Sequence, residues 1–262
     1  MRSELVKALA AECGFELAGV AAAEPLEDFA RYQQWLARGM AGELSYLGGR
    51  RGQMRADPRL LLPAARSVIC VGKLYYVPGD PAGVARMARG EDYHRVVRRG
   101  LERLRARLEQ AAGAPFPSRI CVDTAPLLER SYARRAGLGW IGKNACLIRE
   151  RFGSWFVLGE LLVSLELEPD SAPPDRCGAC TRCIDACPTG ALIPVERGCF
   201  LDARRCLSYW TIERRGAVPD ELRPLMRGWA YGCDICQEVC PWNRFSPVTS
   251  DPAFAAPREY NR

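Results

Sequence analysis

The sequence contains little histidine and little lysine. His94 is the one histidine, Lys7, Lys73 and Lys143 are the lysines, and the remaining basic residues are arginine. The net charge is +6. The planar guanidinium of arginine suits phosphate, but a GC-rich genome also biases codons toward arginine. Composition alone therefore does not establish nucleic-acid binding.

The sequence also lacks a long hydrophobic run. Its most apolar stretch, residues 155–165, is interrupted by Glu160 and is far shorter than the roughly 20 residues of a transmembrane helix. The N-terminal stretch MRSELVKALAAECGFEL carries charges where a signal peptide has its apolar segment. We therefore expect a cytoplasmic protein without a membrane span, whose 13 cysteines are not disulfide-bonded.

No internal repeat of solenoid length and no low-complexity tail is present. The length of 262 residues, with 48% hydrophobic and 26% charged content, is typical of one large domain plus a smaller one. The proline-rich polar segment 168–176 is the candidate boundary, because every cysteine-dense motif follows it. We place one domain at 1–168 and a second at 169–262.

The first domain alternates helical and extended patterns, which predicts an α/β arrangement. Expected helices cover 3–13, 25–38, 93–112 and 126–136; expected strands cover 15–21, 67–76, 119–122, 145–148 and 154–165. In the helix over 93–112 one apolar stripe contains Val97, Leu101, Leu104 and Leu108. The arginines off this stripe are expected to form a solvated face.

The second domain opens with CGACTRCIDACP, residues 177–188. Its C-x2-C-x2-C-x3-C-P spacing is the one with which bacterial ferredoxins hold 4Fe-4S clusters. The motif CDICQEVCP, residues 233–241, repeats it without the first cysteine. Two such clusters need eight thiolates, so an eighth ligand must come from Cys199 or Cys206.

In ferredoxins the cysteine that precedes proline binds the other cluster. This rule assigns Cys177, Cys180, Cys183 and Cys240 to one cluster, and Cys187, Cys233, Cys236 and the eighth cysteine to the other. Paired structural zinc sites also use C-x2-C, but Cys-Pro at both crossover positions favours clusters. The other cysteines, Cys13, Cys70, Cys121 and Cys146, are expected to be small core residues.

Further motifs accompany the cysteines. They are VDTAPLLERSYARRAGLGWIGKNACLI (122–148), FVLGELL (156–162), DARRCLSYWTIE (202–213) and YGCDICQEVCPWN (231–243). In this order, over almost the whole chain, the sequence resembles the epoxyqueuosine reductase family. The resemblance implies an α+β protein with a nitroreductase-like α/β cobalamin-binding domain, followed by a ferredoxin-like domain with two 4Fe-4S clusters.

The resemblance also implies an activity. The family reduces epoxyqueuosine to queuosine at the wobble position of tRNA, the last step of queuosine biosynthesis. Its cofactor is cob(II)alamin, which the two clusters reduce to cob(I)alamin. The implied partners are tRNA carrying epoxyqueuosine in the anticodon loop and an unidentified electron donor, and we expect a monomer. Two other functions are kept as alternatives: a reductive dehalogenase-like cobalamin enzyme, disfavoured because no twin-arginine export signal is present, and a noncatalytic dicluster electron carrier.

Site residues follow from the same resemblance. It selects Cys206 over Cys199 as the eighth ligand and makes Asp123 the proton donor, whereas the sequence by itself favours Asp123 as a cap of the helix over 126–136. It places at the cobalamin Arg55, Asp123, Leu147, Leu158, Ser208 and Asp234.

Two positions are open to more than one interpretation. His94 lies in D-x-H-x-x-V, where the cobalt-binding motif has glycine in place of Val97, so we expect cobalt without a histidine ligand and a polar contact for His94 at a helix end. Arg214 and Arg215 follow the Cys206 segment. They are candidates to bind tRNA phosphates, or they form a solvated helix end.

Overall fold

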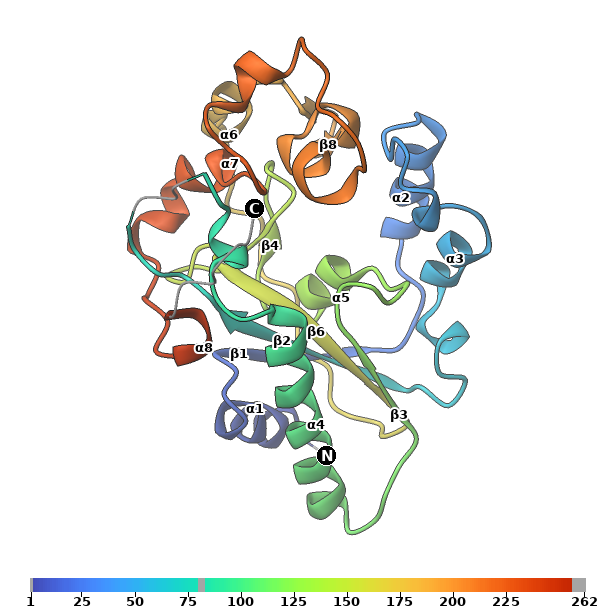
Figure 1. Cartoon of the computed structure of the whole chain (residues 1–262). Helices are drawn as coiled ribbons and strands as arrows, with labels where there is room; N and C mark the ends of the chain where they lie inside the picture. Colours follow the sequence, from blue (N-terminus) through green and yellow to red (C-terminus); the bar gives the residue numbers. More distant parts are fainter. Residues whose placement is uncertain (1, 80–82, 256–262) are drawn as a thin grey trace.

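The centre of the fold is a four-stranded sheet with strand order β1-β2-β6-β3 (Figure 1). The structure, a computed structural model, describes residues 2–79 and 83–255. The strands are β1 (Leu17–Ala22), β2 (Ser67–Leu74), β3 (Ser118–Cys121) and β6 (Phe156–Val163), and each pairing is antiparallel. All four lie within or next to the predicted strands, and the α+β class is confirmed.

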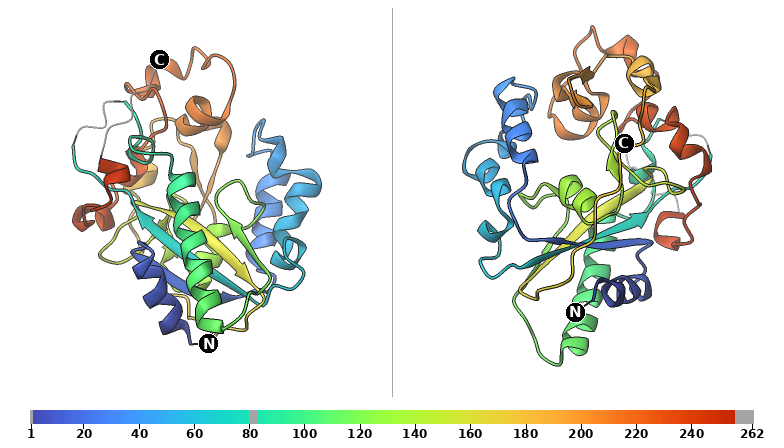
Figure 2. Two further views of the ribbon diagram at one scale, coloured as in Figure 1. Left: turned by 60° about the horizontal axis from the view of Figure 1, so that its bottom comes forward. Right: turned by 180° about the vertical axis from the view of Figure 1, so that it is seen from behind.

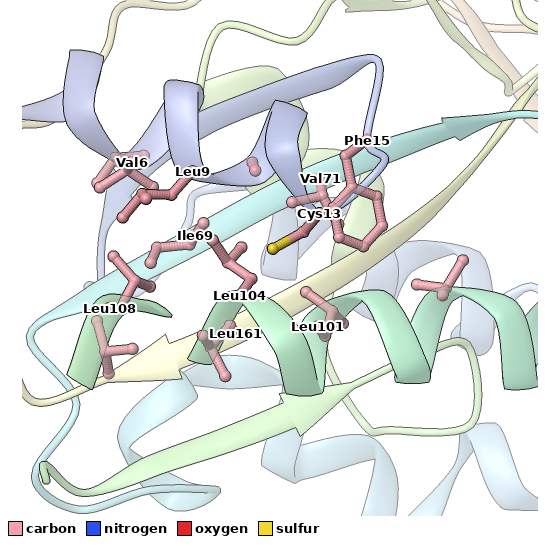
Figure 3. Close-up of a cluster of buried hydrophobic side chains, with 14 of the residues drawn as sticks. Val6, Leu9, Cys13, Phe15, Ile69, Val71, Leu101, Leu104, Leu108 and Leu161 are labelled. Carbon is pink, nitrogen blue, oxygen red and sulfur yellow. The ribbon is translucent and has the colours of Figure 1, made fainter. Parts of the chain in front are cut away.

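Helices cover both faces of this sheet, so all eight residues of β2 are buried. Side chains alternate between the faces of a strand. Ile69 and Val71 of β2 therefore pack against α1 (Ser3–Glu12) and α4 (Tyr93–Ala112), as Figure 3 shows. Val68 and Cys70 point to the opposite face, which α5 (Glu129–Arg135) covers.

Helix α4 has the bounds that its sequence pattern predicts. The Asp92 carboxylate caps the first turn by accepting from the His94 N–H at 3.0 Å, and Gly113 ends the helix with a left-handed φ of 74°. Val97, Leu101, Leu104 and Leu108 are fully buried. The arginines of α4 are exposed, which confirms the solvated face.

A side arm of short helices follows β1 (Figure 1). It contains α2 (Asp28–Ala37), η1 (Ser45–Leu47), α3 (Gly49–Gln53), η2 (Met54–Ala56) and η3 (Pro58–Leu60). Helix α2 begins three residues later than the sequence pattern predicts. Along the chain, two small features come between the arm and the cysteine motifs. They are η4 (Arg86–Ala88) and the two-stranded ribbon formed by β4 (Trp140–Ile141) and β5 (Leu147–Ile148).

The cysteine-rich part lies at one end of the sheet, beside the arm (Figures 1 and 2). Its short elements are α6 (Arg182–Ala186), β7 (Leu192–Pro194), β8 (Cys199–Leu201), η5 (Ala203–Arg205), η6 (Tyr209–Glu213), η7 (Arg223–Met226), α7 (Ile235–Glu238) and η8 (Pro241–Phe245). Loops make up most of this part between its short helices and strands, which is typical of a domain that encloses metal clusters. The chain then returns to the sheet, where Phe254 of α8 (Pro252–Ala255) packs against Leu74 of β2 and Val96 of α4.

Polar contacts join this part to the rest of the chain. The Trp35 indole N–H donates to the Leu201 carbonyl at 2.6 Å, and the Tyr209 hydroxyl accepts from the Glu43 N–H at 3.0 Å. The Thr249 N–H donates to the Tyr76 carbonyl at 2.8 Å. The boundary between 168 and 169 stays a prediction. No helix within 2–79 or 83–255 is long and apolar enough to cross a membrane.

Candidate functional site

The structure brings the first group of cysteines together. One small cavity is lined by Cys177, Cys180, Cys183 and Cys240. Burial raises the pKa of the Cys183 thiol to about 11, and the other three thiols of the group are close enough to contribute. The four residues come from the loop before α6, from α6 itself and from the start of η8. This is the set that the crossover rule assigns to one cluster.

The second group gathers around Cys233. Burial raises its pKa to about 12, and the neighbouring thiols of Cys206 and Cys187 add to the shift. The Cys236 thiol lies near Cys206 and Cys233. Cys199 instead lies near Cys177, in the other group. The geometry therefore favours Cys206 as the eighth ligand, although the ligand assignments stay predictions.

The chemistry of these groups fits clusters. Among the described residues, no three histidine, cysteine, aspartate or glutamate side chains converge as a single metal ion requires. A cubane distributes its four thiolates over four iron atoms, so its ligands need not meet at one point. The backbone N–H groups of Ser208 and Tyr209 and the Ser208 hydroxyl donate to the Cys206 sulfur, a pattern that stabilises a thiolate.

Asp123 lies in a tight turn directly after β3. Its φ of 50° is left-handed, and the Thr124 N–H donates back to the Val122 carbonyl at 2.5 Å. The Asp123 side chain is 55% exposed. The residue at the N-terminus of α5 is Leu128, so the interpretation of Asp123 as a helix cap is wrong. An exposed carboxylate in this uncommon backbone conformation is instead a feature of functional sites.

His94 holds the Asp123 carboxylate. Its Nε2 is 3.3 Å from Asp123 Oδ2, and its Nδ1 is 2.7 Å from Asp92 Oδ1. The ring stacks on Tyr93 with centroids 4.0 Å apart. Burial alone would lower the pKa of His94, but its bonds to Asp92 and Asp123 outweigh this and raise the pKa. The polar contact was predicted, whereas its partner Asp123 was not.

Tyr46 connects the Asp123 turn with the cysteine-rich part. Its hydroxyl donates to Glu213 Oε2 at 3.2 Å, and Glu213 ends η6, which follows Cys206. Burial raises the pKa of Tyr46 to about 12, the Glu213 carboxylate adds to the shift, and Asp123 contributes further. The Tyr46 hydroxyl is therefore bonded to η6 and lies within electrostatic range of the proton-donor candidate.

The residues expected at a cobalamin divide into two sets. Arg55, Leu158 and Ser208 keep free capacity: the buried Arg55 guanidinium donates to the Arg51 carbonyl and lies 5.6 Å from the Tyr32 ring centroid, contacts that do not use all five of its N–H groups. Leu158 and Ser208 are partly exposed. Guanidinium and hydroxyl donors together with a partly exposed apolar side chain have the chemistry to bind a large cofactor with phosphate and amide groups.

The other two residues are enclosed by protein. Leu147 is 4% exposed and belongs to the core beneath α5. Asp234 is 1% exposed, and its carboxylate accepts from the Arg86 N–H at 2.8 Å. Their side chains have little free surface for a cofactor, and their assignment stays a prediction.

The two candidate arginines differ from each other. The Arg214 guanidinium is 3.0 Å from Glu43 Oε1 and 4.5 Å from the Trp210 ring centroid. Arg215 is exposed. One arginine is thus already paired and the other faces solvent, and phosphate binding stays a prediction for both.

Three features were missed by the sequence analysis or differ from it. Cys13, Cys70 and Cys121 are buried as expected, but Cys146 is partly exposed and lies near Cys183 and Cys240 of the first group and Cys236 of the second. Glu129 accepts from the Asp123 N–H at 2.6 Å, and Glu160 is fully buried in β6. The available signal was Glu160 itself, the charge that interrupts the most apolar stretch.

Comparison with known proteins agrees with this geometry. Residues 176–243 match the 4Fe-4S double cluster binding domain, and residues 55–124 match the family described as epoxyqueuosine reductase QueG, DUF1730. Among curated proteins, the epoxyqueuosine reductase of Xanthomonas campestris is 44% identical over 96% of this chain and 72% of its own length. That of Escherichia coli K12 is 40% identical over 97% of this chain and 68% of its own length.

Solved structures give the same result. An epoxyqueuosine reductase bound to an epoxyqueuosine-modified tRNA-Tyr stem loop superposes with a TM-score of 0.86 and 32% identity, over 97% of this chain and 68% of that one. The enzyme from Streptococcus thermophilus gives 0.84 and 33%, over 95% and 68%. A catabolic reductive dehalogenase, at 15% identity and a TM-score of 0.56 over 94% of this chain and 32% of that one, shares the fold alone.

The double-cluster domain beside a sheet that presents an acidic turn defines an iron-sulfur oxidoreductase. The sequence identity of 40 to 44% over nearly the whole chain specifies which one. The chain belongs to the epoxyqueuosine reductase family.

Proposed function

We propose that this protein reduces epoxyqueuosine to queuosine in tRNA. The observation that carries the proposal is the exposed Asp123 carboxylate, which His94 holds, in the same fold as two gathered groups of cysteines. Conversion of an epoxide to an alkene consumes two electrons and two protons and releases water. A site for this reaction therefore needs a route for electrons next to a group that supplies protons.

The electron route is built from the two cysteine groups. Cys177, Cys180, Cys183 and Cys240 would hold one 4Fe-4S cluster, and Cys187, Cys206, Cys233 and Cys236 would hold the other. The crossover supports this, because each motif contributes its last cysteine, Cys187 or Cys240, to the other group, as in ferredoxins. When bound, the clusters would pass single electrons to a cobalamin, which supplies a strongly reducing cobalt centre.

Asp123 is the residue that would donate a proton to the epoxide oxygen. Opening of the epoxide leaves charge on the oxygen, and an acid positioned at that oxygen lowers the barrier. His94 orients the Asp123 carboxyl through Nε2 at 3.3 Å, and Asp92 fixes the imidazole through Nδ1 at 2.7 Å. The left-handed turn leaves the carboxyl 55% exposed and within electrostatic range of Tyr46. Arg55, Leu158 and Ser208 would bind the cofactor there.

The proposed organisation has a cobalamin-binding domain at 1–168 and a dicluster domain at 169–262. An epoxyqueuosine reductase has been solved with a modified tRNA stem loop, and we extend that substrate to this chain, with Arg215 and Arg214 as phosphate contacts. We further propose that the protein is a cytoplasmic monomer that receives electrons from a separate donor.

Nucleoside analysis tests the function directly. In a strain that lacks this gene, mass spectrometry of digested tRNA should detect epoxyqueuosine in place of queuosine. The gene on a plasmid should restore queuosine, and the Cys206→Ala gene should not, because one cluster lacks a ligand. Unchanged queuosine in the deletion strain would remove the proposed function.

A further inference from the structure

A carboxyl group without a protein donor lies in the middle of the central sheet. Glu160 of β6 is 0% exposed, and its register partners are Cys70 of β2 and Cys121 of β3. No donor of the described residues bonds to either of its oxygens. A buried carboxylate without a donor is strongly disfavoured, and an unsatisfied group of this kind requires an explanation.

A second carboxyl lies close to this one. Glu129, the first residue of α5, lies within hydrogen-bonding reach of Glu160. Two carboxylates have no proton to share and repel each other, so this contact is a hydrogen bond only when one of them is protonated. The arrangement therefore predicts a Glu129–Glu160 pair with one proton between the two side chains.

The groups around the pair favour the protonated state. Cys70 and Cys121 face Glu160 from the neighbouring strands, and burial raises the pKa of both thiols, so they are neutral. Tyr93 of α4 and Asp123 add no positive charge. The cation beside Glu129 is Arg130, whose guanidinium is already bonded to the Ala145 carbonyl. Burial, with the nearby Asp123 charge, raises the pKa of Glu129 to about 7, and burial with the neighbouring Glu129 raises the pKa of Glu160 well above its ordinary value, so the pair keeps one proton at neutral pH.

The pair is connected to the candidate proton donor through the backbone. Glu129 Oε1 accepts from the Asp123 N–H at 2.6 Å, directly at the left-handed residue of the turn. Glu129 can hold this N–H only while its side chain stays over the sheet. A Bacillus subtilis epoxyqueuosine reductase has been solved with its catalytic loop swung out of the active site, so such a loop has a second position in a relative.

We propose that the proton shared by Glu129 and Glu160 keeps the Asp123 turn in place, so that both glutamates are positioning residues for Asp123. With the proton present, Glu129 bonds both to Glu160 and to the Asp123 N–H. Without it, two buried charges repel, Glu129 leaves the pair, and the turn is released. The functional consequence rests on the proposed function; the structural part does not.

Two substitutions of Glu160 separate this role from simple packing. Glu160→Gln supplies an amide N–H that donates to Glu129 at every pH, so the turn should stay held without a titrating proton. Glu160→Leu has a similar volume and no donor, so the turn should be released at every pH. Glu166→Gln is the matched control, because Glu166 is 79% exposed and its partner is the exposed Arg66.

The first measurement needs no substrate. Hydrogen–deuterium exchange of the peptide that contains Asp123, corrected for intrinsic pH dependence, should be slow in the wild type at neutral pH and about tenfold faster once the pH has risen through the raised pKa of Glu160. Glu160→Gln should stay slow across the range and Glu160→Leu fast across it. Equal exchange in these two variants, or a wild type without pH dependence, would overturn the proposal.

The second measurement detects the proton itself. Infrared difference spectra of the wild type, taken from neutral to alkaline pH, should show the C=O band of a protonated carboxylic acid disappear as the pH rises through the raised pKa of Glu160. Glu160→Gln should lack this band, and Glu166→Gln should retain it. Absence of the band from the wild type would end the inference.

Activity then connects the pair to the reaction. Single-turnover reduction by Glu160→Leu should be about tenfold to a hundredfold slower than by the wild type. The single-turnover rate of Glu160→Gln should lie within a few-fold of the wild-type rate and should not decline at alkaline pH. A wild type inactive on epoxyqueuosine would remove the proposed function while the exchange and infrared results stand. An active wild type with Glu160→Leu at full rate would remove the positioning role.

Discussion

Substitution of Asp123 by asparagine tests the proton donor with little change of structure. Asparagine is nearly isosteric with aspartate and, like it, tolerates the left-handed φ of 50° found at this position. Its amide cannot release a proton to the departing oxygen. A positioned general acid contributes about 10²- to 10⁴-fold, so the single-turnover rate of Asp123→Asn should fall by that factor, which is about 3 to 5 kcal/mol of barrier.

The backbone of the turn gives a second magnitude. Alanine at a left-handed position is disfavoured by about 1 to 2 kcal/mol, so Asp123→Ala should lower the free energy of unfolding by about that amount. Asp123→Asn should leave the free energy of unfolding near the wild-type value, because its backbone cost is small. Urea unfolding of both variants therefore separates a structural effect of the substitution from a chemical one.

The assay is single turnover of an epoxyqueuosine-modified stem loop by protein loaded with both cofactors. Binding of the stem loop is measured in parallel and should not change in Asp123→Asn. Asp220→Asn is the control, because the Asp220 side chain is 93% exposed. A wild-type rate for Asp123→Asn, with both cofactors bound, would refute the reasoning that makes Asp123 the acid.

Three further predictions follow from the same structure. Cys206→Ala should lose about half of the bound iron, because one of two clusters lacks a thiolate, while Cys199→Ala keeps all of it; full iron in Cys206→Ala would exclude this ligand. The double change of Arg214 and Arg215 to glutamine should weaken stem-loop binding and make the negative slope of log K against log salt shallower by about 1.5. The iron content should stay unchanged. An unchanged slope would mean that the phosphates bind elsewhere on the protein. Protonation of His94 stabilises the fold because, against the effect of burial, its carboxylate partners raise its pKa above 6.5. The contribution of protonated His94 is complete below the ordinary histidine pKa and is lost as the pH rises through the raised pKa. Between about pH 6 and pH 8 the urea midpoint should therefore fall more in the wild type than in His94→Asn. Equal falls in the two proteins would contradict this prediction.

The sequence by itself determined the elements and the metal chemistry. The stripe of Val97, Leu101, Leu104 and Leu108 specified α4 because these residues recur at the helical period, and all four are fully buried. The cysteine spacing specified the double-cluster domain because local spacing decides which thiols can reach one cluster, and residues 176–243 match that domain. Both are local properties of the chain.

Local patterns did not determine strand direction or the set of groups around Asp123. An apolar run such as β2 is buried whether its neighbours are parallel or antiparallel, so only the assembled sheet decides that every pairing is antiparallel. Asp123 precedes a helical pattern, and the sequence therefore favoured a cap, but the chain turns at φ 50° and α5 starts at Glu129.

Only the tertiary structure decided what surrounds the acid. His94 lies 29 positions before Asp123 and comes within 3.3 Å of it because α4 packs along β6 and β3. Glu160 meets Glu129 because the central strand passes beneath α5. The positions of these charges depend on pairings between distant segments, which no local periodicity records. The acid itself follows from the family motif, whereas the groups that hold it in place follow from the fold.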